Sequence, residues 1–229
     1  MEEQEGCYKL PAVERNALLN RPDFCHFNGG HAVLEKSPND LALLLRTLQF
    51  ATLKHSTQRR KDPEKTPYIN HPIGVANILA SEGGVTDVAV LQGALLHDTV
   101  EDTNTTLDEI ENHFGASVRR IVEEVTDNKA LSYDERKRHQ IARAPFVSYE
   151  AKLVKLADKL HNLRDLLRCA PEGWSPERVL TYFEWAKKVV EGLLGTNLDL
   201  EEAIRLVMAR KGVVLPSDRP SLLRDDSPL

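Results

Sequence analysis

The sequence predicts an all-α protein, built as a single compact helical bundle of roughly eight or more helices. Apolar residues recur at three- and four-residue spacings through most of residues 39–215, as in helices with one buried face. Helix-starting polar residues and helix-ending glycines separate these stretches, and no β-type alternation lasts beyond a few residues. The 229 residues, 41% of them hydrophobic, suffice for one substantial core.

Each helix is expected between a recognisable start and end. The first runs from a cap at Asn39 or Asp40 to about residue 57, with an apolar stripe of Leu41, Leu44, Leu45, Leu48 and Ala51. Pro72 suits the first turn of the second helix, Gly83-Gly84 ends it, and Thr86 can cap the third. Later helices are expected to begin at Thr106, Ser132, Ser148, Ser175 and Asn197, with ends at Gly115, Cys169, Gly195 and Gly212.

The two ends of the chain lack this periodicity. Residues 1–38 include the glycine-containing stretch PDFCHFNGGH, whose two histidines we interpret as surface residues. The tail PSDRPSLLRDDSPL is rich in proline, serine and aspartate. We therefore expect a disordered N-terminal extension over 1–38, one folded domain over 39–215, and a disordered tail over 216–229.

Composition excludes several classes of protein. The net charge of −5 argues against a general nucleic-acid binder, including a helix-turn-helix DNA binder. No apolar run is long enough to span a bilayer, and the acidic N-terminus has no secretory h-region. Three widely spaced cysteines predict no disulfide framework and favour a cytoplasmic location. Two basic clusters, QRRK (58–61) and ERKRHQ (135–140), suit a small anionic ligand, although each taken alone is more simply a solvated surface.

The stretch GALLHDTVEDT (93–103) places His97 and Asp98 side by side where an apolar helix ends. Adjacent helical residues point about 100° apart, so they can meet at one ion only near a helix end or an irregularity. A solvated helix end is the simpler alternative. Two further candidate ligands are His71, just before a proline at a helix start, and Asp158, in an apolar helical segment. For Asp158 alone, a salt bridge to Lys155, Lys159 or Arg164 is the simpler interpretation.

Three motifs in order carry a family resemblance: H-P-x-x-V-A from residue 71, H-D-x-x-E-D from residue 97 and V-K-L-A-D-x-x-H-N from residue 154. The chain from about residue 45 to 200 resembles the hydrolase domain of the RelA/SpoT family, within the HD-domain metal hydrolases. The segments FGASVRRIVEEVTD and RRKDPEKTPYINHP also resemble that family. The short length and the stretches TPYINHPIGVA, HDTVEDT and PEGW resemble the metazoan members of that family. We therefore do not expect the synthetase and regulatory domains that the long bacterial members carry.

The resemblance implies roles for individual residues. The metal ligands would be His71, His97, Asp98 and Asp158, and the catalytic acidic pair would be Glu101 and Asp102. Two nitrogen and two oxygen donors without thiolate suit Mn²⁺ or Fe²⁺ better than a structural zinc. The family favours one Mn²⁺ per chain, with Fe²⁺ or Zn²⁺ as alternatives.

The resemblance implies a substrate side as well. Its residues would be Arg60 and Lys61 of the segment RRKDPEKTPYIN (the basic loop), Tyr68 in the same segment, Lys155 and Asn162 on the helix of Asp158, and Arg178 and Tyr182 on the next helix. For Tyr182 a core position remains an equal alternative. Lys129, Arg136, Lys137 and Arg138 are expected on the surface.

Two functions from different classes follow. The first is hydrolysis of guanosine 3′,5′-bis(diphosphate), ppGpp, to GDP and pyrophosphate; the same machinery could remove a ribose 2′- or 3′-phosphate, as on NADPH. The second is a non-catalytic nucleotide sensor, against which the complete set of ligands and acidic residues argues. The expected partner is a small nucleotide, with no nucleic acid and no membrane; the sequence leaves the oligomeric state open.

Overall fold

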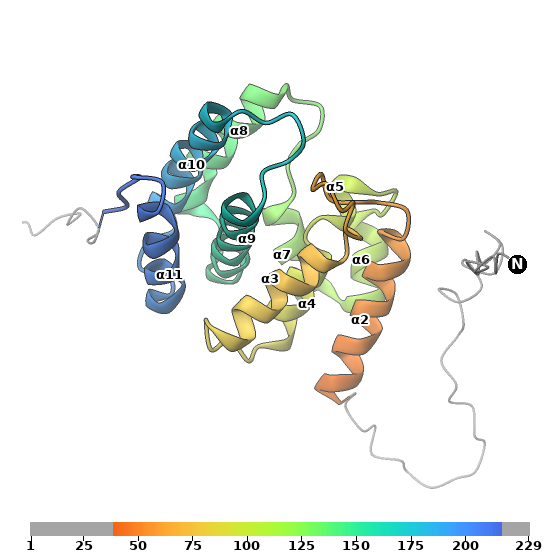
Figure 1. Ribbon diagram of the computed structural model, residues 1–229. Helices are drawn as coiled ribbons and strands as arrows, with labels where there is room; N and C mark the ends of the chain where they lie inside the picture. The colour runs from red at the N-terminus through yellow and green to blue at the C-terminus, as the bar shows by residue number, and fades with distance from the viewer. Residues whose placement is uncertain (1–38, 217–229) are drawn as a thin grey trace, which may run out of the picture. The chain divides into compact units, whose positions relative to one another are not determined.

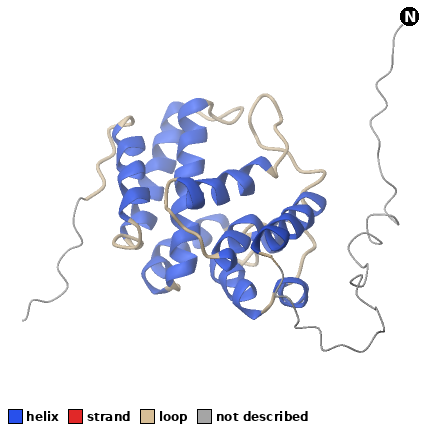
Figure 2. Cartoon of the chain, turned by 90° about the horizontal axis from the view of Figure 1, so that it is seen from below, coloured by secondary structure: helices blue, strands red, loops and turns tan. Residues whose placement is uncertain are grey.

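Helices make up the regular structure of residues 39–216, the part of the chain that this computed structural model describes. Within that range there are ten α-helices, one short 3₁₀ helix and no strand, apart from an isolated bridge between Arg59 and Pro67 (Figure 2). The prediction of an all-α fold with eight or more helices is confirmed. The extension predicted over 1–38 and the tail after Pro216 lie outside the described residues.

Apart from a long loop over residues 55–69, between the first two helices, the helices follow one another with shorter connections (Figure 1). In chain order they are α2 (Asp40–Lys54), α3 (Asn70–Ser81), α4 (Val88–Leu96), α5 (Thr99–Asp102), α6 (Leu107–Phe114), α7 (Ala116–Val125), α8 (Tyr133–Arg143), η1 (Ala144–Phe146), α9 (Tyr149–Arg168), α10 (Pro176–Glu191) and α11 (Leu198–Ala209). Among residues 39–216 no helix has both the length and the apolar composition that crossing a membrane requires.

Most helix starts lie where the sequence places them. The Ser132 hydroxyl accepts a hydrogen bond from the Glu135 N–H, and the Glu135 carboxylate accepts one from the Ser132 N–H, which is the expected capping box. Ser148 and Ser175 cap α9 and α10 through side chains that accept from the Ala151 and Arg178 N–H groups. Thr86 was the wrong cap for α4, because the Asp87 carboxylate accepts from the Ala89 N–H at 2.8 Å.

The first helix buries only part of the apolar stripe that was expected. Ala51 of that stripe is buried and Leu44 packs against the core, but Leu41 and Leu45 are 62% and 56% exposed. Thr47 and Phe50, which lie outside the stripe, are buried instead. The Thr47 hydroxyl donates to the Leu43 carbonyl and accepts a hydrogen bond from Gln92 on α4 at 2.8 Å. A polar residue can therefore stand at the interface with α4, because its hydrogen bonds are satisfied there.

The two helices α4 and α9 form the centre of the domain. Residues Val90–Leu96 of α4 are all buried, and α4 packs against α2, α3, α7 and α9. The α9 helix packs against α3, α4, α7, α10 and α11. Its Leu156, Leu160 and Leu163 are fully buried, and each such side chain contributes roughly 1.5–3 kcal/mol relative to an exposed one. This packing brings the start of α3, the end of α4 and the middle of α9 to one place.

Candidate functional site

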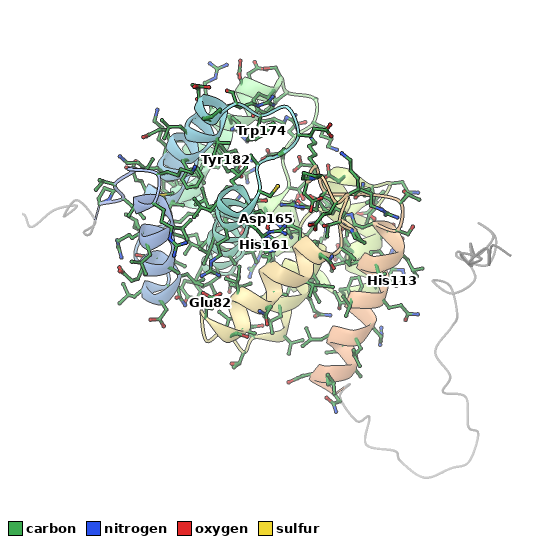
Figure 3. The ribbon with its side chains drawn as sticks, viewed as in Figure 1. Glu82, His113, His161, Asp165, Trp174 and Tyr182 are labelled. Atoms are coloured by element: carbon green, nitrogen blue, oxygen red, sulfur yellow. The ribbon has the colours of Figure 1, made fainter. Side chains whose placement is uncertain are left out.

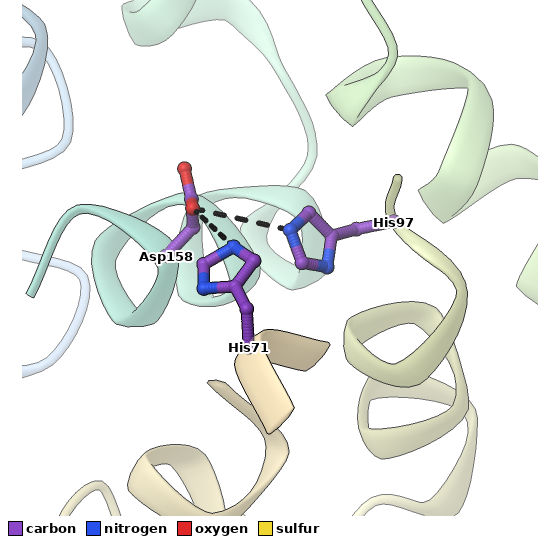
Figure 4. Close-up of side chains that lie close together, drawn as sticks. All are labelled: His71, His97 and Asp158. Carbon is purple, nitrogen blue, oxygen red and sulfur yellow. Dashed lines mark ion pairs between the residues drawn. The ribbon is translucent and has the colours of Figure 1, made fainter. Parts of the chain in front are cut away.

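Three helices bring nitrogen and oxygen donors together at that place (Figure 4). His71 is the second residue of α3, His97 follows the last residue of α4, and Asp158 lies midway along α9. The Nε2 atoms of His71 and His97 are 3.2 and 3.9 Å from Asp158 Oδ1. One donor atom from each of the three residues lies within 4.8 Å of the other two. Both imidazoles are buried, at 2% and 6% exposure.

The fourth predicted ligand, Asp98, lies beside this group of three. It occupies the junction between α4 and the short α5, where its φ of −98° and ψ of −5° bend the chain. Asp98 Oδ2 is 3.0 Å from His97 Nε2 and 3.6 Å from His71 Nε2. The helix junction therefore allows two adjacent residues to face the same centre.

The donor atoms at this centre fit a divalent cation. His97 directs Nδ1 to the Ala94 carbonyl at 2.7 Å, which leaves Nε2 facing the two aspartates. That Nε2 atom is buried and has no hydrogen-bond partner among the described residues. A buried nitrogen lone pair beside carboxylate oxygens is the arrangement that a metal ion satisfies.

The electrostatics of the centre favour ionised carboxylates. Burial alone would raise the pKa of the Asp98 carboxyl, but the neighbouring His97 outweighs burial and holds that pKa well below its ordinary range. Lys159, followed by His71, likewise overcomes burial and holds the pKa of Asp158 far below normal. Burial lowers the pKa of His97, yet Asp98 and Asp158 raise it to about 9, so a cation that binds here would displace a proton from Nε2. Two buried negative charges thus meet at a point where a cation would offset them.

Tyr68, expected beside the substrate, lines the two cavities beside the centre and also contacts the acidic residues of the centre. Its hydroxyl donates to Asp98 Oδ2 at 2.6 Å and lies 3.4 Å from Asp102 Oδ2. Burial, followed by the charge of Asp98, raises the pKa of the phenol, so the hydroxyl remains a donor. Tyr68 therefore orients a predicted metal ligand as well as lining the pocket.

The acidic pair lies one turn beyond Asp98, and its two members have different partners. Glu101 accepts from the Asp127 N–H at 3.1 Å and lies 3.5 Å from Arg136 Nη1. Burial raises the pKa of Glu101. Asp102 instead pairs with Lys129 at 3.0 Å. A carboxylate with a raised pKa exchanges protons more readily near neutral pH, which suits Glu101 to proton transfer.

Two adjoining cavities lie beside this centre, and one of them is lined by some of its donor residues. The larger, of about 320 Å³, is lined by His71, Asp98, Glu101 and Asp158 together with cationic and aromatic side chains. The other, of about 290 Å³, lies against the basic loop and Pro171. Both cavities are lined by Arg60, Tyr68, Asp102, Asn162, Trp174 and Tyr182. Figure 3 labels Trp174 and Tyr182 above the middle of α9.

The basic loop is held in place by its own hydrogen bonds. Asp62 accepts from the Thr66 N–H at 3.0 Å and from the Thr66 hydroxyl at 2.6 Å. Arg60 Nη2 then reaches α9, where it donates to Asn162 Oδ1 at 2.9 Å and lies 2.8 Å from Asp165 Oδ2. Asn162 in turn donates to Asp158 at 2.6 Å. The loop is therefore connected to the donor cluster through α9.

The other predicted substrate residues are spread more widely. Lys61 lines the smaller cavity. Arg178 stacks on Trp174, with its guanidinium carbon 4.4 Å from the ring centroid, but lines neither cavity. Lys155 is buried and lines neither cavity either. The geometry gives these two residues no direct support as substrate contacts.

Lys137, expected on the surface, lines the larger cavity instead. Its ammonium lies 3.8 Å from the centroid of Trp185, 5.0 Å from that of Tyr182 and 5.2 Å from that of Tyr133. Burial, followed by the charge of Lys159, lowers its pKa to about 8. It forms no ion pair with the described residues. The basic stretch at 135–140 was the signal, but only the fold shows that this lysine faces inward.

A further histidine belongs to the third family motif, V-K-L-A-D-x-x-H-N, but no role of its own was predicted for it from the sequence. His161, one residue before Asn162, contacts His71 on α3. Burial, followed by the charge of His71, lowers the pKa of His161 to about 4, so its ring is neutral at neutral pH.

Comparison with known proteins agrees with this architecture. Residues 47–179 match the model of the HD domain family. A human protein named guanosine-3′,5′-bis(diphosphate) 3′-pyrophosphohydrolase MESH1 is 64% identical over 177 residues, which are 77% of this chain and 99% of the human protein. The Drosophila melanogaster protein of the same name is 51% identical over 173 residues, 76% of this chain and 97% of the relative.

A solved structure gives the same result. It is described as a metazoan ortholog of SpoT that hydrolyses ppGpp, and it matches with a TM-score of 0.75 and 50% sequence identity. The match covers 78% of this chain and 99% of the other. The resemblance drawn from the three motifs is thus confirmed: the chain belongs to the HD-domain family and, within it, to the RelA/SpoT-type hydrolases.

Proposed function

We propose that this protein is a metal-dependent hydrolase that converts guanosine 3′,5′-bis(diphosphate) to GDP and pyrophosphate. The observation that carries the proposal is the convergence of His71, His97 and Asp158 from three helices, with Asp98 beside them and a nucleotide-sized cavity next to them. The names of the human and fly relatives support this substrate. The intact donor set and acidic pair disfavour a non-catalytic sensor.

The four donor residues would hold one divalent ion, for which the donor set favours Mn²⁺, with Fe²⁺ and Zn²⁺ as alternatives. The bound ion would supply a water of lowered pKa and offset negative charge on the phosphate. The chain itself prepares this centre, because the Ala94 carbonyl and the Tyr68 hydroxyl fix the directions of His97 and Asp98.

In this proposal Glu101 and Asp102 have different roles towards the attacking water. Glu101, with its raised pKa, would accept the water's proton. Asp102, held by Lys129 and Tyr68, would orient the water. Both line the same cavity as the donor cluster, so either side chain is close to a phosphate held there.

The two cavities suggest how a nucleotide lies. Arg60 and Lys61 border the smaller cavity, which we assign to the base and sugar. Cationic Arg136, Lys137 and Lys159 border the larger one, which we assign to the phosphates. In this orientation the 2′/3′ edge of the ribose faces the donor cluster, and the 5′ chain is left intact.

A second candidate substrate is the 2′-phosphate of NADPH. The observation that favours it is the adjoining pair of cavities, since a dinucleotide has a second half that must be accommodated. The chemistry at the donor cluster would be the same, with release of a monophosphate.

The test is a substrate panel with product identification. The purified protein, loaded in turn with Mn²⁺, Fe²⁺ or Zn²⁺, is incubated with guanosine 3′,5′-bis(diphosphate), NADPH, GTP and a deoxynucleoside triphosphate. We expect GDP and pyrophosphate from the first substrate, with Mn²⁺ the most effective ion. Phosphate release from the 5′ end of GTP, with the 3′-diphosphate left intact, would reject the proposal. Binding without turnover would favour a sensor.

A further inference from the structure

His161 on α9 makes a direct contact with a proposed metal ligand. Its Nδ1 atom is 3.0 Å from His71 Nδ1, and the two rings meet nearly edge to face, with centroids 4.7 Å apart at 70°. Figure 3 labels His161 and Asp165 on α9, the helix that packs against α3. His161 lines neither cavity, so it stands behind the centre and away from the substrate.

The contact assigns a tautomer to each ring. His71 Nε2 faces Asp158 Oδ1 at 3.2 Å, and a nitrogen that binds a cation must carry a lone pair. The proton of neutral His71 then resides on Nδ1 and is donated to His161 Nδ1. His97 follows the same pattern, with Ala94 O as its acceptor. The two histidines at the centre thus have different acceptors behind them, a backbone carbonyl for His97 and an imidazole for His71.

Gly74 provides the space for this second imidazole. It lies one turn after His71 on α3, and a Cβ built there would stand 2.2 Å from His161 Nε2 and 2.4 Å from Cδ2. Any side chain at position 74 would displace the ring. Glycine within a helix lowers its stability by roughly 0.5–1 kcal/mol relative to alanine. At position 74 the missing side chain leaves the space in which His161 contacts His71.

The same ring also lies near the substrate loop. His161 Nδ1 is 3.7 Å from Asp165 Oδ2, the oxygen that lies 2.8 Å from Arg60 Nη2. His161 is therefore close to the ion pair that holds Arg60 against α9, as well as to His71.

We propose that His161 is a positioning residue, whose Nδ1 acceptor fixes the ring plane and tautomer of His71 in the space left by Gly74. The proposal rests on the assignment of His71 to the metal centre. The alternative is that His161 only fills the gap between α3 and α9.

A pair of substitutions separates these accounts. In His161→Asn the side-chain oxygen can take the place of Nδ1 and keep an acceptor, whereas His161→Leu has a similar shape and no acceptor. Mn²⁺ affinity is measured by calorimetry on metal-free protein, alongside its thermal unfolding. We expect His161→Leu to bind Mn²⁺ about 10–100-fold more weakly, and His161→Asn to stay close to the unsubstituted protein. Unchanged affinity in His161→Leu, or equal losses in both variants, would overturn the proposal.

A second set of variants covers the case in which His161→Leu fails to fold. Gly74→Ala should displace the ring and weaken Mn²⁺ binding. The double variant Gly74→Ala/His161→Ala removes the clash, so its packing should recover while its Mn²⁺ affinity stays low. Recovery of affinity in the double variant would support the space-filling account and overturn ours. If the unsubstituted protein binds no Mn²⁺, the proposed function itself fails, which is distinct from normal binding with no effect of His161.

Discussion

His97 and Asp98 are neighbours in sequence, yet both face the same centre because the chain bends between α4 and α5. The bend places the Asp98 carboxylate 3.0 Å from its neighbour's Nε2 atom. The orientation of each of these two side chains is therefore set by a separate hydrogen bond. Each has a fixed direction, set by Ala94 O for the imidazole and by the Tyr68 hydroxyl for the carboxylate.

The first prediction concerns metal content. The double variant His97→Ala/Asp98→Ala removes two of the four donor residues and should lose nearly all bound Mn²⁺, as measured by elemental analysis after loading. His139→Ala, which changes an exposed histidine on α8, is the matched control and should keep its metal. Near-stoichiometric metal in the double variant would show that the ion is held elsewhere.

The second prediction separates binding from turnover. Glu101→Gln and Asp102→Asn retain side-chain shape and should retain the metal. Loss of a general base typically costs about 10²–10⁴-fold in rate, and we expect the larger loss at Glu101 because its pKa is raised. The measurement is kcat with metal content determined on the same samples. A Glu101→Gln variant that turns over at the unsubstituted rate would remove that residue from the mechanism.

The helix α8 has a polar sequence that suggests a solvent-exposed helix, yet several of its side chains line the larger cavity. The Lys137→Met variant keeps the aliphatic stem against Trp185 and removes the charge. It should raise KM for guanosine 3′,5′-bis(diphosphate) more than it lowers kcat, because a phosphate contact of this kind is similar in ground and transition states. Arg138→Met, an exposed neighbour, serves as the control. A kcat effect larger than the KM effect would contradict this role.

The contact between the end of α3 and α9 predicts a dependence of stability on pH. Arg164 Nη1 and Nη2 lie 2.6 and 2.8 Å from the two carboxylate oxygens of Glu82, and this hydrogen bonding lowers the pKa of Glu82 below its ordinary 4.5. Because the folded pKa is the lower one, the stabilisation is present above pH 4.5 and is lost as the pH falls through the folded value.

Both side chains are more than a third exposed, so solvent screening limits the effect. We expect Arg164→Met to reduce the free energy of unfolding by about 0.2–1 kcal/mol at neutral pH. Denaturant titrations at several pH values check this. A difference between the two proteins that persists unchanged in acid would mean that the ion pair is not its source.

Elements and site were predictable from sequence to different extents. Helix starts at Ser132, Ser148 and Ser175 were predicted correctly because a cap is a contact between residues three positions apart. The exposed Leu41 was misplaced because periodicity shows that a helix has an apolar stripe but not which neighbour covers it. The contact of His161 with His71 spans ninety positions, and no local pattern reports it. Motif order predicted the donor residues, and the fold places donor atoms of His71, His97 and Asp158 within 4.8 Å of one another.

For the whole molecule, the domain limits remain a prediction. The family match covers residues 47–179, and the described helices extend from Asp40 to Ala209. A chain of residues 39–216 alone should therefore unfold at the same temperature as the full chain and have the same kcat/KM. Calorimetry and steady-state kinetics on both proteins test this. Loss of either property would assign a role to the terminal segments.

The donor residues belong to helices that meet only when the domain is assembled, since α3 and α9 are distant in sequence and packed in space. An ion bound by these residues would bind only the folded state and would therefore stabilise it. Free metal at a hundred times its dissociation constant would add about 2.7 kcal/mol to the free energy of unfolding. A cell short of that metal would therefore hold a protein more easily degraded as well as less active, so supply of the ion would set the protein's lifetime as well as its rate.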